Sequence, residues 1–384
     1  MNRSLIWLGS SLFLWGVGES MFLLFQPVYL QELGAGPIQI GAILGAFGAA
    51  MTLTHIPAGH LSDRVGRRPL LIAAWIIGAL STLVMAMARS LLPFVTGLLL
   101  YGLTAFVASP LSSYTTTARG KWSVGRALTF ISMTFNAGAV IGPLIGGRVA
   151  EDYGFRTVYF IAAGLFVFST LAVLMVKAQP RDHHDPDHPP AALRRNRRYL
   201  TFLAVFFFVA FAAYIPQPLS SNYLRNQQEL SLTAIGQLIS IAYLGTTILA
   251  LVLGQLQART GFLLGQVGVA AFAMLLWRGL GFGWFAVGYF LLGGYRPLRS
   301  LGVAQVRSFV HKSQMGLAYG MAETLASTST LLAPPLAGLL YARDPALMYP
   351  TGLLMIAAGI AITLVVVPRS PVLPADHVDM MVEP

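Results

Sequence analysis

The chain has 384 residues, of which 56% are hydrophobic and only 10% are charged, and its mean hydropathy is +0.69. Soluble proteins carry about a quarter charged residues, so this composition excludes a water-soluble domain and indicates a protein whose solvent is mostly lipid. The absence of cysteine excludes disulfides, thiolate nucleophiles and cysteine-ligated metal sites.

Twelve apolar stretches are long enough to cross a bilayer, because a spanning helix needs about 20 mostly apolar residues. The first is too long for the apolar core of a cleavable signal peptide, which has about 7–15 residues. The predicted spans are residues 5–30, 38–58, 70–88, 91–111, 127–150, 155–177, 199–224, 233–253, 262–278, 282–301, 315–341 and 347–367. We therefore predict an all-α membrane protein.

The net charge of +11 is distributed between loops in a way that orients these spans. With both termini in the cytoplasm, 19 of the 25 Lys and Arg residues fall on the cytoplasmic side and six on the outer side. Positively charged loops stay in the cytoplasm. This predicts a multi-pass protein of the cell (inner) membrane with cytoplasmic N- and C-termini, and it accounts for the basic charge without a nucleic-acid partner.

Two acidic residues lie well inside predicted spans, Glu19 in the first and Glu323 in the eleventh, whereas the other twelve lie in loops, at span ends, in the linker or in the tail. An ionisable group within the bilayer is costly and marks a functional site by default. The alternative for each is a structural hydrogen bond to a neighbouring helix. Arg296, in the tenth span, is expected to point inward and to pair with Glu323, while Arg299 is expected to reach the lipid headgroups.

The loop after the second span is rich in glycine and arginine, with the sequence GHLSDRVGRR at residues 59–68. Glycine at both ends of the loop permits a tight turn between two helices. Asp63 can face the positive N-terminal end of a neighbouring helix, expected to be the eleventh near residues 314–316, and Arg119 is a candidate ion partner. The alternative is a topological role alone. The candidate residues of this loop and its contacts are Gly59, Asp63, Arg64, Gly66, Arg67, Arg68 and Arg119.

The fifth span contains small residues four apart around a proline, in the pattern GxxxGPxxGG, formed by Gly138, Gly142, Pro143, Gly146 and Gly147. Small residues at this spacing let two helices approach closely, and the proline removes a backbone donor. The structural alternative is ordinary tight packing, for example against the eighth helix.

Residues 178–198 form a polar, proline-rich segment that we interpret as a cytoplasmic linker between an N-terminal bundle, 1–177, and a C-terminal bundle, 199–367, which a tail at 368–384 follows. The linker's residues 183–188 carry His and Asp residues that leave metal binding open, although a solvated hinge is the favoured interpretation. The two halves repeat at an offset of 191 residues. Gln26-Pro27 matches Gln217-Pro218, and Gly142-Pro143 matches Ala333-Pro334. Between these matches the offset reaches 195, where Gly41 matches Gly236. Duplicated halves imply a binding site between them near mid-membrane.

The loop at 59–68 resembles the signature of the major facilitator superfamily, G-x-L-a-D-r-x-G-r-r, in the place where that family has it. The fifth-span motif resembles one associated with its 12-helix drug:proton antiporter branch. The resemblance implies two pseudo-symmetric six-helix bundles and a central cavity lined by helices one, four, seven and ten. It also implies that the loop at 59–68 and its contacts form a cytoplasmic latch between the bundles. One feature of that branch, an arginine four residues before a glycine in helix four, is replaced here by Leu98 before Gly102. This departure concerns the route of proton coupling and not the fold.

These observations predict a secondary transporter that exports an amphipathic small molecule by alternating access, driven by protons. Alternatives are an importer or facilitator of a polar solute such as a sugar, and a lipid flippase. Glu19 is the candidate proton carrier and Glu323 the reserve. The expected cavity residues are Trp15, Phe22, Gln26, Asn136, Tyr214, Gln217, Tyr243 and Arg296. We expect no catalytic site, cofactor or resident metal. The expected partners are a small-molecule substrate, protons and membrane lipid, and the chain is expected to be a monomer.

Overall fold

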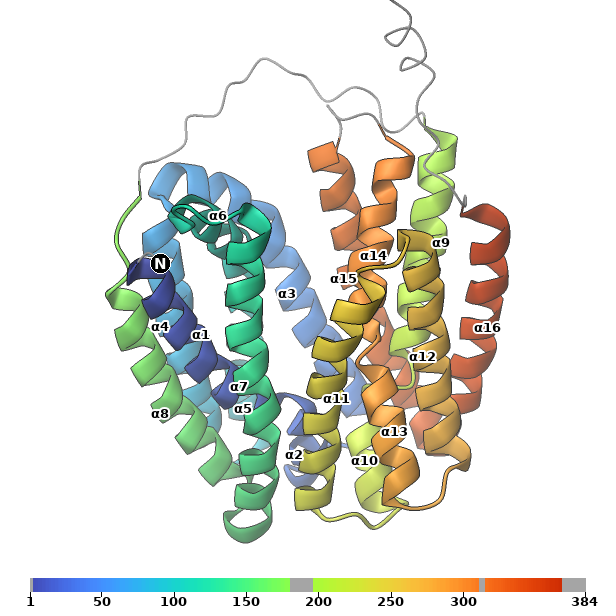
Figure 1. The fold of residues 1–384 in the computed structure, drawn as a ribbon. Helices are drawn as coiled ribbons and strands as arrows, with labels where there is room; N and C mark the ends of the chain where they lie inside the picture. The colour runs from blue at the N-terminus through green and yellow to red at the C-terminus, as the bar shows by residue number, and fades with distance from the viewer. Residues whose placement is uncertain (1–2, 180–195, 311–314, 368–384) are drawn as a thin grey trace, which may run out of the picture.

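The computed structural model describes residues 3–179, 196–310 and 315–367, with side chains described throughout except at residues 55–64 and 315–317. Within these ranges all regular structure is helical and no strand occurs. The helices run roughly along one direction and form two groups (Figure 1). The predicted all-α membrane fold is therefore confirmed.

The described helices of the first half of the chain fit six passes, two of which are interrupted. In chain order they are α1 (Arg3–Ser20) with a 3-10 turn (Leu23–Phe25) and α2 (Gln26–Glu32); α3 (Pro37–Val65); α4 (Arg67–Met87); α5 (Leu91–Leu103) with a 3-10 turn (Thr104–Val107) and α6 (Ala108–Ala118); α7 (Val124–Tyr153); and α8 (Phe155–Leu174). The interrupted passes are the first and the fourth.

The second half repeats this order, again with interruptions in its first and fourth passes. The passes are α9 (Arg197–Tyr214) with α10 (Ser220–Asn226); α11 (Leu232–Leu253); α12 (Ala258–Arg278); α13 (Phe282–Leu292) with α14 (Tyr295–Gln305) and a 3-10 turn (Val306–Ser308); α15 (Met315–Arg343); and α16 (Met348–Val366). Eleven helices among the described residues are long and apolar enough to cross a membrane. The tenth predicted span is divided at Gly293–Gly294, so the structure is consistent with twelve passes.

Proline accompanies the interruption in the first pass of each half. Pro27 lies in the first turn of α2, where its missing N–H costs no helical hydrogen bond. Pro216 and Pro218 fall between α9 and α10, and each lacks the donor that a continuous helix would use there. The interrupted passes therefore expose irregular backbone, which is tolerated in a membrane protein where it borders a cavity or is buried by other helices.

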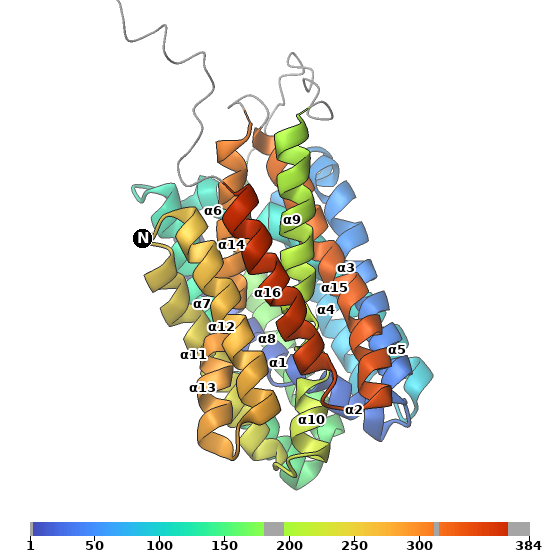
Figure 2. The same cartoon turned by 90° about the vertical axis from the view of Figure 1, so that its right-hand side faces the viewer.

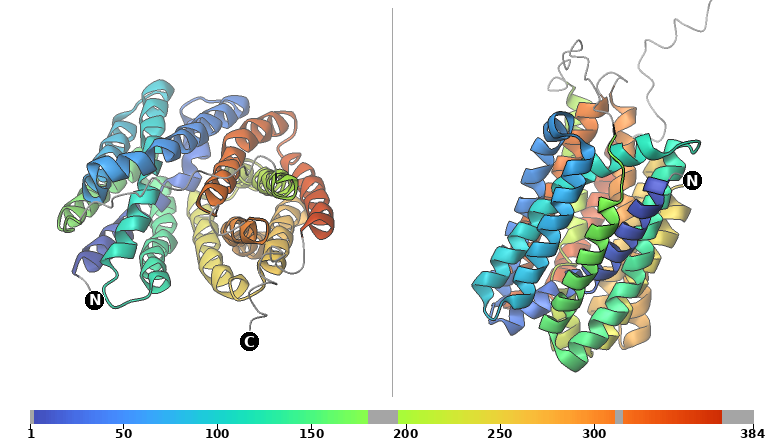
Figure 3. Two further views of the ribbon diagram at one scale, coloured as in Figure 1. Left: turned by 90° about the horizontal axis from the view of Figure 1, so that it is seen from above. Right: turned by 90° about the vertical axis from the view of Figure 1, so that its left-hand side faces the viewer.

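The two halves form separate helix groups when seen along the bundle axis (Figure 3). Among the described residues, their main contacts join α3 with α15, α7 with α11, and α2 with α10. Figure 2 shows α15 beside α3, with α9 and α16 on the same outer face. The contacts concentrate at the end opposite the one where α8 ends and α9 begins. We call this end the far side and the other end the linker side, where the two groups diverge (Figure 1).

Two of these contacts are copies of each other. A Cβ on Gly41 would lie 2.5 Å from the Pro334 carbonyl oxygen and 3.1 Å from the Gly338 Cα. A Cβ on Gly236 would lie 2.3 Å from the Pro143 carbonyl oxygen and 3.2 Å from the Gly147 Cα. These are the positions that the internal repeat pairs, so the repeated residues form the two symmetry-related interfaces between the halves.

Polar contacts close the far side further. Ser221 Oγ donates to the Leu24 carbonyl at 2.8 Å, and Asn222 Nδ2 donates to Gln31 Oε1 at 2.6 Å. The Glu151 carboxylate, at the end of α7, accepts hydrogen bonds from the backbone N–H groups of Leu232 and, at 3.3 Å, Thr233. Glu151 thereby caps the first turn of α11 in the opposite bundle.

The fifth-span glycine motif divides its contacts between two neighbours. A Cβ on Gly138, Gly142 or Gly146 would lie within 2.3 Å of atoms of residues 13–21, in α1 and the turn that follows it. Gly147, by contrast, meets the Leu232 carbonyl of α11 at 2.5 Å. The structural alternative, tight packing against the eighth span (α11), therefore holds for one of the motif's two faces. The other face packs against the first span.

Candidate functional site

A cavity of about 980 Å³ lies between the two bundles. Residues of all four interrupted passes line it, together with residues of α3, α4, α7, α11 and α15. It extends from the breaks at Pro27 and Pro218 to residues of α6 and early α7, such as Thr115 and Leu128, near the linker side. Such a size and a mostly apolar lining with a few polar groups are typical of small-molecule sites.

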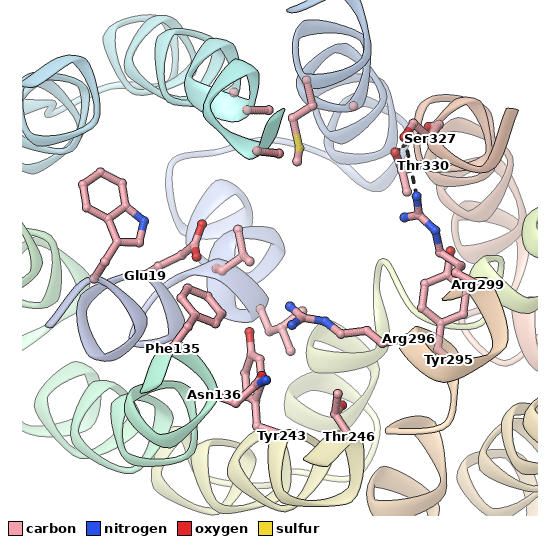
Figure 4. A pocket seen from close by; sticks show the side chains of 18 of the residues that line it. Glu19, Phe135, Asn136, Tyr243, Thr246, Tyr295, Arg296, Arg299, Ser327 and Thr330 are labelled. Atoms are coloured by element: carbon pink, nitrogen blue, oxygen red, sulfur yellow. Dashed lines mark hydrogen bonds between the residues drawn. The ribbon is translucent and has the colours of Figure 1, made fainter. Parts of the chain in front are cut away.

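Glu19 lies on α1, two residues before the first interruption, and its carboxylate points into the cavity (Figure 4). The Tyr101 hydroxyl, from the end of α5, donates a hydrogen bond to Glu19 Oε1 at 2.8 Å. Beneath this pair, Trp15 stacks on Phe166 with ring centroids 4.0 Å apart. The aromatic packing fixes the wall of the cavity from which the carboxylate projects.

Arg296 projects from α14 in the opposite bundle toward the centre of the same cavity (Figure 4). Its guanidinium carbon lies 5.7 Å from the centroid of the Tyr243 ring of α11, a cation–π contact. Asn136, from α7, lies beside Tyr243 in this view. Groups of both bundles therefore converge on one region of the cavity.

The predicted Arg296–Glu323 pair is wrong. Glu323, on α15, pairs with Arg299 Nη2 at 3.3 Å, and the same nitrogen lies 3.5 Å from Ser327 Oγ. The expectation that Arg299 reaches the headgroups is also wrong, because Arg299 lines the cavity. A hydrated cavity wall can accommodate the charge of Arg299, as the headgroup region would.

Polar side chains mark the deep end of the cavity, next to the helix interruptions. Gln26 is only 1% exposed, and its Nε2 makes no hydrogen bond among the described residues. Gln217 Nε2 donates to the Ala213 carbonyl of its own helix at 2.7 Å. The two glutamines occupy matching positions of the repeat, but only Gln26 keeps an unsatisfied donor.

Of the predicted cavity residues, Phe22 alone lies elsewhere. It is fully buried in the first bundle and packs against Tyr159 at 4.8 Å between ring centroids. A helix has several faces, so an aromatic residue near a polar one in sequence need not share its environment. The predicted residues that line the cavity are Trp15, Glu19, Gln26, Asn136, Tyr214, Gln217, Tyr243, Arg296 and Glu323.

Several cavity residues were not predicted, notably Tyr101, Phe135, Thr246 and Arg299. The first three are aromatic or small polar residues that are common throughout the spans, so composition gives no sign of which face they occupy. Tyr101 lies next to Gly102 in the fourth pass, which the sequence does place at the cavity. Leu98, where the drug:proton branch carries arginine, is fully buried and does not line the cavity.

The latch residues are described in part. Gly66 adopts a positive φ of 95° at the start of α4, as its role in a tight turn requires. Arg67 donates to Thr117 Oγ1 at 2.6 Å, and Arg68 Nε donates to the Val176 carbonyl at 2.7 Å, both within the first bundle. Arg119 follows the end of α6. The side chains of Asp63 and Arg64 and the surroundings of Gly59 lie outside the described residues.

A metal site is absent where the structure can test for one. No group of three or more His, Asp or Glu side chains that could hold a metal occurs within the described ranges. The His and Asp residues of the linker, at 183–188, lie outside those ranges.

The family model described as Major Facilitator Superfamily matches residues 8–294 of the chain. Among curated relatives, the multidrug resistance protein MdtG of Serratia proteamaculans is 29% identical over 238 residues, which cover 59% of this chain and 57% of that protein. The multi-drug resistance efflux pump PmrA of Streptococcus pneumoniae is 27% identical over 276 residues, 68% of each. The chain spans about half the length of the first curated relatives that it matches.

Solved structures give the same fold at low identity. The nucleoside transporter NupG superposes with a TM-score of 0.78 at 14% identity, over 95% of this chain and 98% of that one. The POT family transporter PepTSo superposes with a TM-score of 0.76 at 12% identity, over 95% of this chain and 97% of that one. At these identities the likeness concerns the fold alone. The family match, which rests on sequence, is what indicates a multi-pass membrane transporter rather than an enzyme.

Proposed function

Since the chain belongs to the major facilitator superfamily, we propose that it is a secondary active exporter that moves an amphipathic small molecule out of the cell in exchange for protons. The names of the relatives MdtG and PmrA support export, as does the complete GxxxGPxxGG motif of α7. The observation that carries the proton coupling is the placement of Glu19. It is an acidic group on a helix before a break, in the wall of a cavity between two bundles.

Alternating access supplies the transport step. The halves touch on the far side and diverge on the linker side, and positively charged loops favour a cytoplasmic linker. In this interpretation the structure is open to the cytoplasm, residues 178–198 tether the two bundles there, and rocking of the bundles opens the cavity outward. The chain carries out this cycle as a monomer.

Glu19 provides the minimum chemistry for antiport. Removal from water favours the neutral form of a carboxyl, whereas contact with water favours the ionised form. A proton taken up from the outside is released when the cavity opens to the cytoplasm. A cationic group of the substrate then pairs with the ionised carboxylate of Glu19, so proton and substrate exclude each other.

Arg296 supplies to the cavity the positive charge that the fourth pass lacks. Its charge attracts that of Glu19 across the cavity, from the tenth pass of the other bundle. Because the partner lies in the other half of the molecule, rocking of the bundles changes its distance from Glu19. The attraction therefore varies through the cycle, as release of a proton in one state and its uptake in the other require.

The test uses proteoliposomes with an imposed pH gradient and a transported fluorescent amphiphile. Glu19→Gln should abolish accumulation driven by the gradient while leaving exchange of substrate across the membrane partly intact, because only the proton site is lost. Glu323→Gln, which changes the other acidic residue among the described residues that line the cavity, should retain gradient-driven accumulation. Accumulation by Glu19→Gln but not by Glu323→Gln would mean that Glu323 carries the proton. Accumulation by both would exclude carboxylate coupling in the cavity, and uptake in the opposite direction would identify an importer.

A further inference from the structure

The charges of the cavity leave one acid and one base without a direct partner. Among the side chains that the structure describes, four charged residues line it, Glu19, Arg296, Arg299 and Glu323. Arg299 and Glu323 form an ion pair at 3.3 Å and neutralise each other. No ion pair joins Glu19 to Arg296 in the part of the chain that the structure describes, although both point into the cavity.

These two charges face each other from opposite bundles. The Glu19 carboxylate projects from α1 and the Arg296 guanidinium from α14, with Tyr243 and Asn136 near the space between them (Figure 4). Tyr101 donates one hydrogen bond to Glu19, which leaves the second carboxylate oxygen available. Arg296 meets the face of the Tyr243 ring and keeps its N–H donors available for a bound group.

Unsatisfied amide groups add to this polar region. Gln26 is nine-tenths buried or more, lines the cavity and has an unpaired Nε2. Asn136 lines the cavity as well, and its buried Oδ1 has no partner among the described residues. A buried polar atom without a partner is costly and is expected to meet a ligand group or water. The cavity thus offers both a free donor and a free acceptor.

A substrate with one charge fits this arrangement poorly. A simple cation would be attracted by Glu19 but repelled by Arg296. A simple anion would be attracted by Arg296 but repelled by Glu19. A molecule with a cationic group and an anionic group would pair with both. The apolar lining, which includes Leu12, Leu44 and Met51, suits the apolar body of such a molecule.

We infer that the preferred substrate is a zwitterionic amphiphile, with an amine beside Glu19 and a carboxylate, sulfonate or phosphate group beside Arg296. This inference rests on the proposed function, because it concerns the substrate of the same cavity. It keeps the exchange with protons, since a protonated Glu19 no longer attracts the amine. Arg296 is then a specificity-determining residue as well as the partner of Glu19.

The test measures binding of four probes that share one scaffold. O-benzyl-tyrosine is a zwitterion, its methyl ester is a cation, its N-acetyl derivative is an anion, and the N-acetyl methyl ester is neutral. Dissociation constants from isothermal titration calorimetry on the purified, full-length protein at pH 6, where the amine of the methyl ester is protonated, should favour the zwitterion over each derivative by about 10- to 100-fold. This is the range for a hydrogen-bonded charged group.

Two substitutions identify the residue that recognises each group. Arg296→Gln should remove the preference for the zwitterion over the methyl ester, whereas Arg296→Lys, which keeps the charge, should retain part of it. Glu19→Gln should remove the preference for the zwitterion over the N-acetyl derivative. Arg278→Gln, a change of the same kind at the far-side end of α12, should leave both preferences unchanged. Thermal unfolding of each variant without ligand checks that it is folded.

A methyl ester that binds the wild type as tightly as the zwitterion would overturn the inference. So would an unchanged ranking in Arg296→Gln, or binding of none of the four probes. These outcomes do not depend on the direction of transport. Proton-driven export with a preference for cations would leave the proposed function standing and refute the zwitterion, whereas uptake with a preference for zwitterions would do the reverse.

Discussion

Arg296 and Arg299 show how closely spaced residues come to have different partners. Both follow the interruption at Gly293–Gly294 and both line the cavity. Arg296 meets the Tyr243 ring, while Arg299 pairs with Glu323. A break in a helix rotates the following segment about the helix axis. The helical period of the residues before the break therefore cannot predict which side chains of α14 face the cavity.

The Arg299–Glu323 pair is expected to be structural and tolerant of reversal. The side chains are 25% and 56% exposed, so the pair is partly hydrated and contributes about 0–1 kcal/mol to stability. Arg299→Glu or Glu323→Arg alone places like charges together and should reduce transport several-fold. The double exchange Arg299→Glu with Glu323→Arg should restore it, as measured by gradient-driven transport in proteoliposomes. If the double variant has normal thermal stability but does not transport, Glu323 itself carries the proton.

For single residues, charge was the sequence feature that best predicted which side chains face the cavity. Glu19 and Arg296 could be predicted to face the cavity because an ionisable group in an apolar span has few other stable places. Phe22 and Tyr101 illustrate the limit. Both are aromatic residues of cavity-lining passes, but Phe22 is buried among rings of the first bundle, whereas Tyr101 reaches Glu19. An aromatic side chain is stable on either face, so only the packed structure separates them.

At the scale of the element, the glycine motif of α7 combines two surfaces in one helix. Gly138, Gly142 and Gly146 follow each other at four-residue spacing and contact α1 and the turn that follows it. Gly147 lies 100° further around the helix and contacts α11. The pattern predicts that helices approach closely, but it does not say that two different neighbours share the small residues.

The contact with the first pass predicts a large stability effect at Gly146. A Cβ there would lie 2.2 Å from the Met21 carbonyl oxygen, a backbone atom that cannot rotate away. Gly146→Ala should therefore destabilise the protein by about 1–3 kcal/mol, the usual cost of overpacking. Gly164→Ala in α8, where a Cβ would meet nothing within 4 Å, serves as the control and should be neutral or slightly stabilising. The measurement is the unfolding temperature of each purified variant, which should be lower for Gly146→Ala than for Gly164→Ala. Equal values would contradict this account of the packing.

At the scale of the whole molecule, the repeat in the sequence predicts which residues form the interfaces between halves. Gly41 and Gly236 match each other, as do Gly147 and Gly338, and each contact joins a member of one pair to a member of the other. The repeat therefore gave the pseudo-symmetric architecture and its small-residue contacts. It could not give the conformation, because the same interfaces can close on either side with little difference in free energy.

A single acidic residue breaks this symmetry on the far side. Glu151 accepts hydrogen bonds from Leu232 and Thr233 at the start of α11, so a charge of one bundle stabilises a helix end of the other. The contact exists when the bundles meet on the far side and is lost when they separate there. Glu151 should therefore favour the state that is open on the linker side.

Neutralising Glu151 should shift the balance between the two states. A charge at a helix N-terminus contributes about 0.3–1 kcal/mol, so Glu151→Gln should change the ratio of states by about two- to fivefold in favour of closure on the linker side. The matched control is Asp152→Asn, which removes the same charge one residue later from a pair with Arg148 inside α7.

Distances between spin labels on the linker side measure this shift directly. The chain has no native cysteine, so labels can be placed at Lys121→Cys and Arg307→Cys, two exposed positions in opposite bundles. Glu151→Gln should increase the population with the shorter distance, and Asp152→Asn should leave the distribution as in the labelled parent. If the two variants behave alike, the effect belongs to the net charge of the far side and not to the cap on α11.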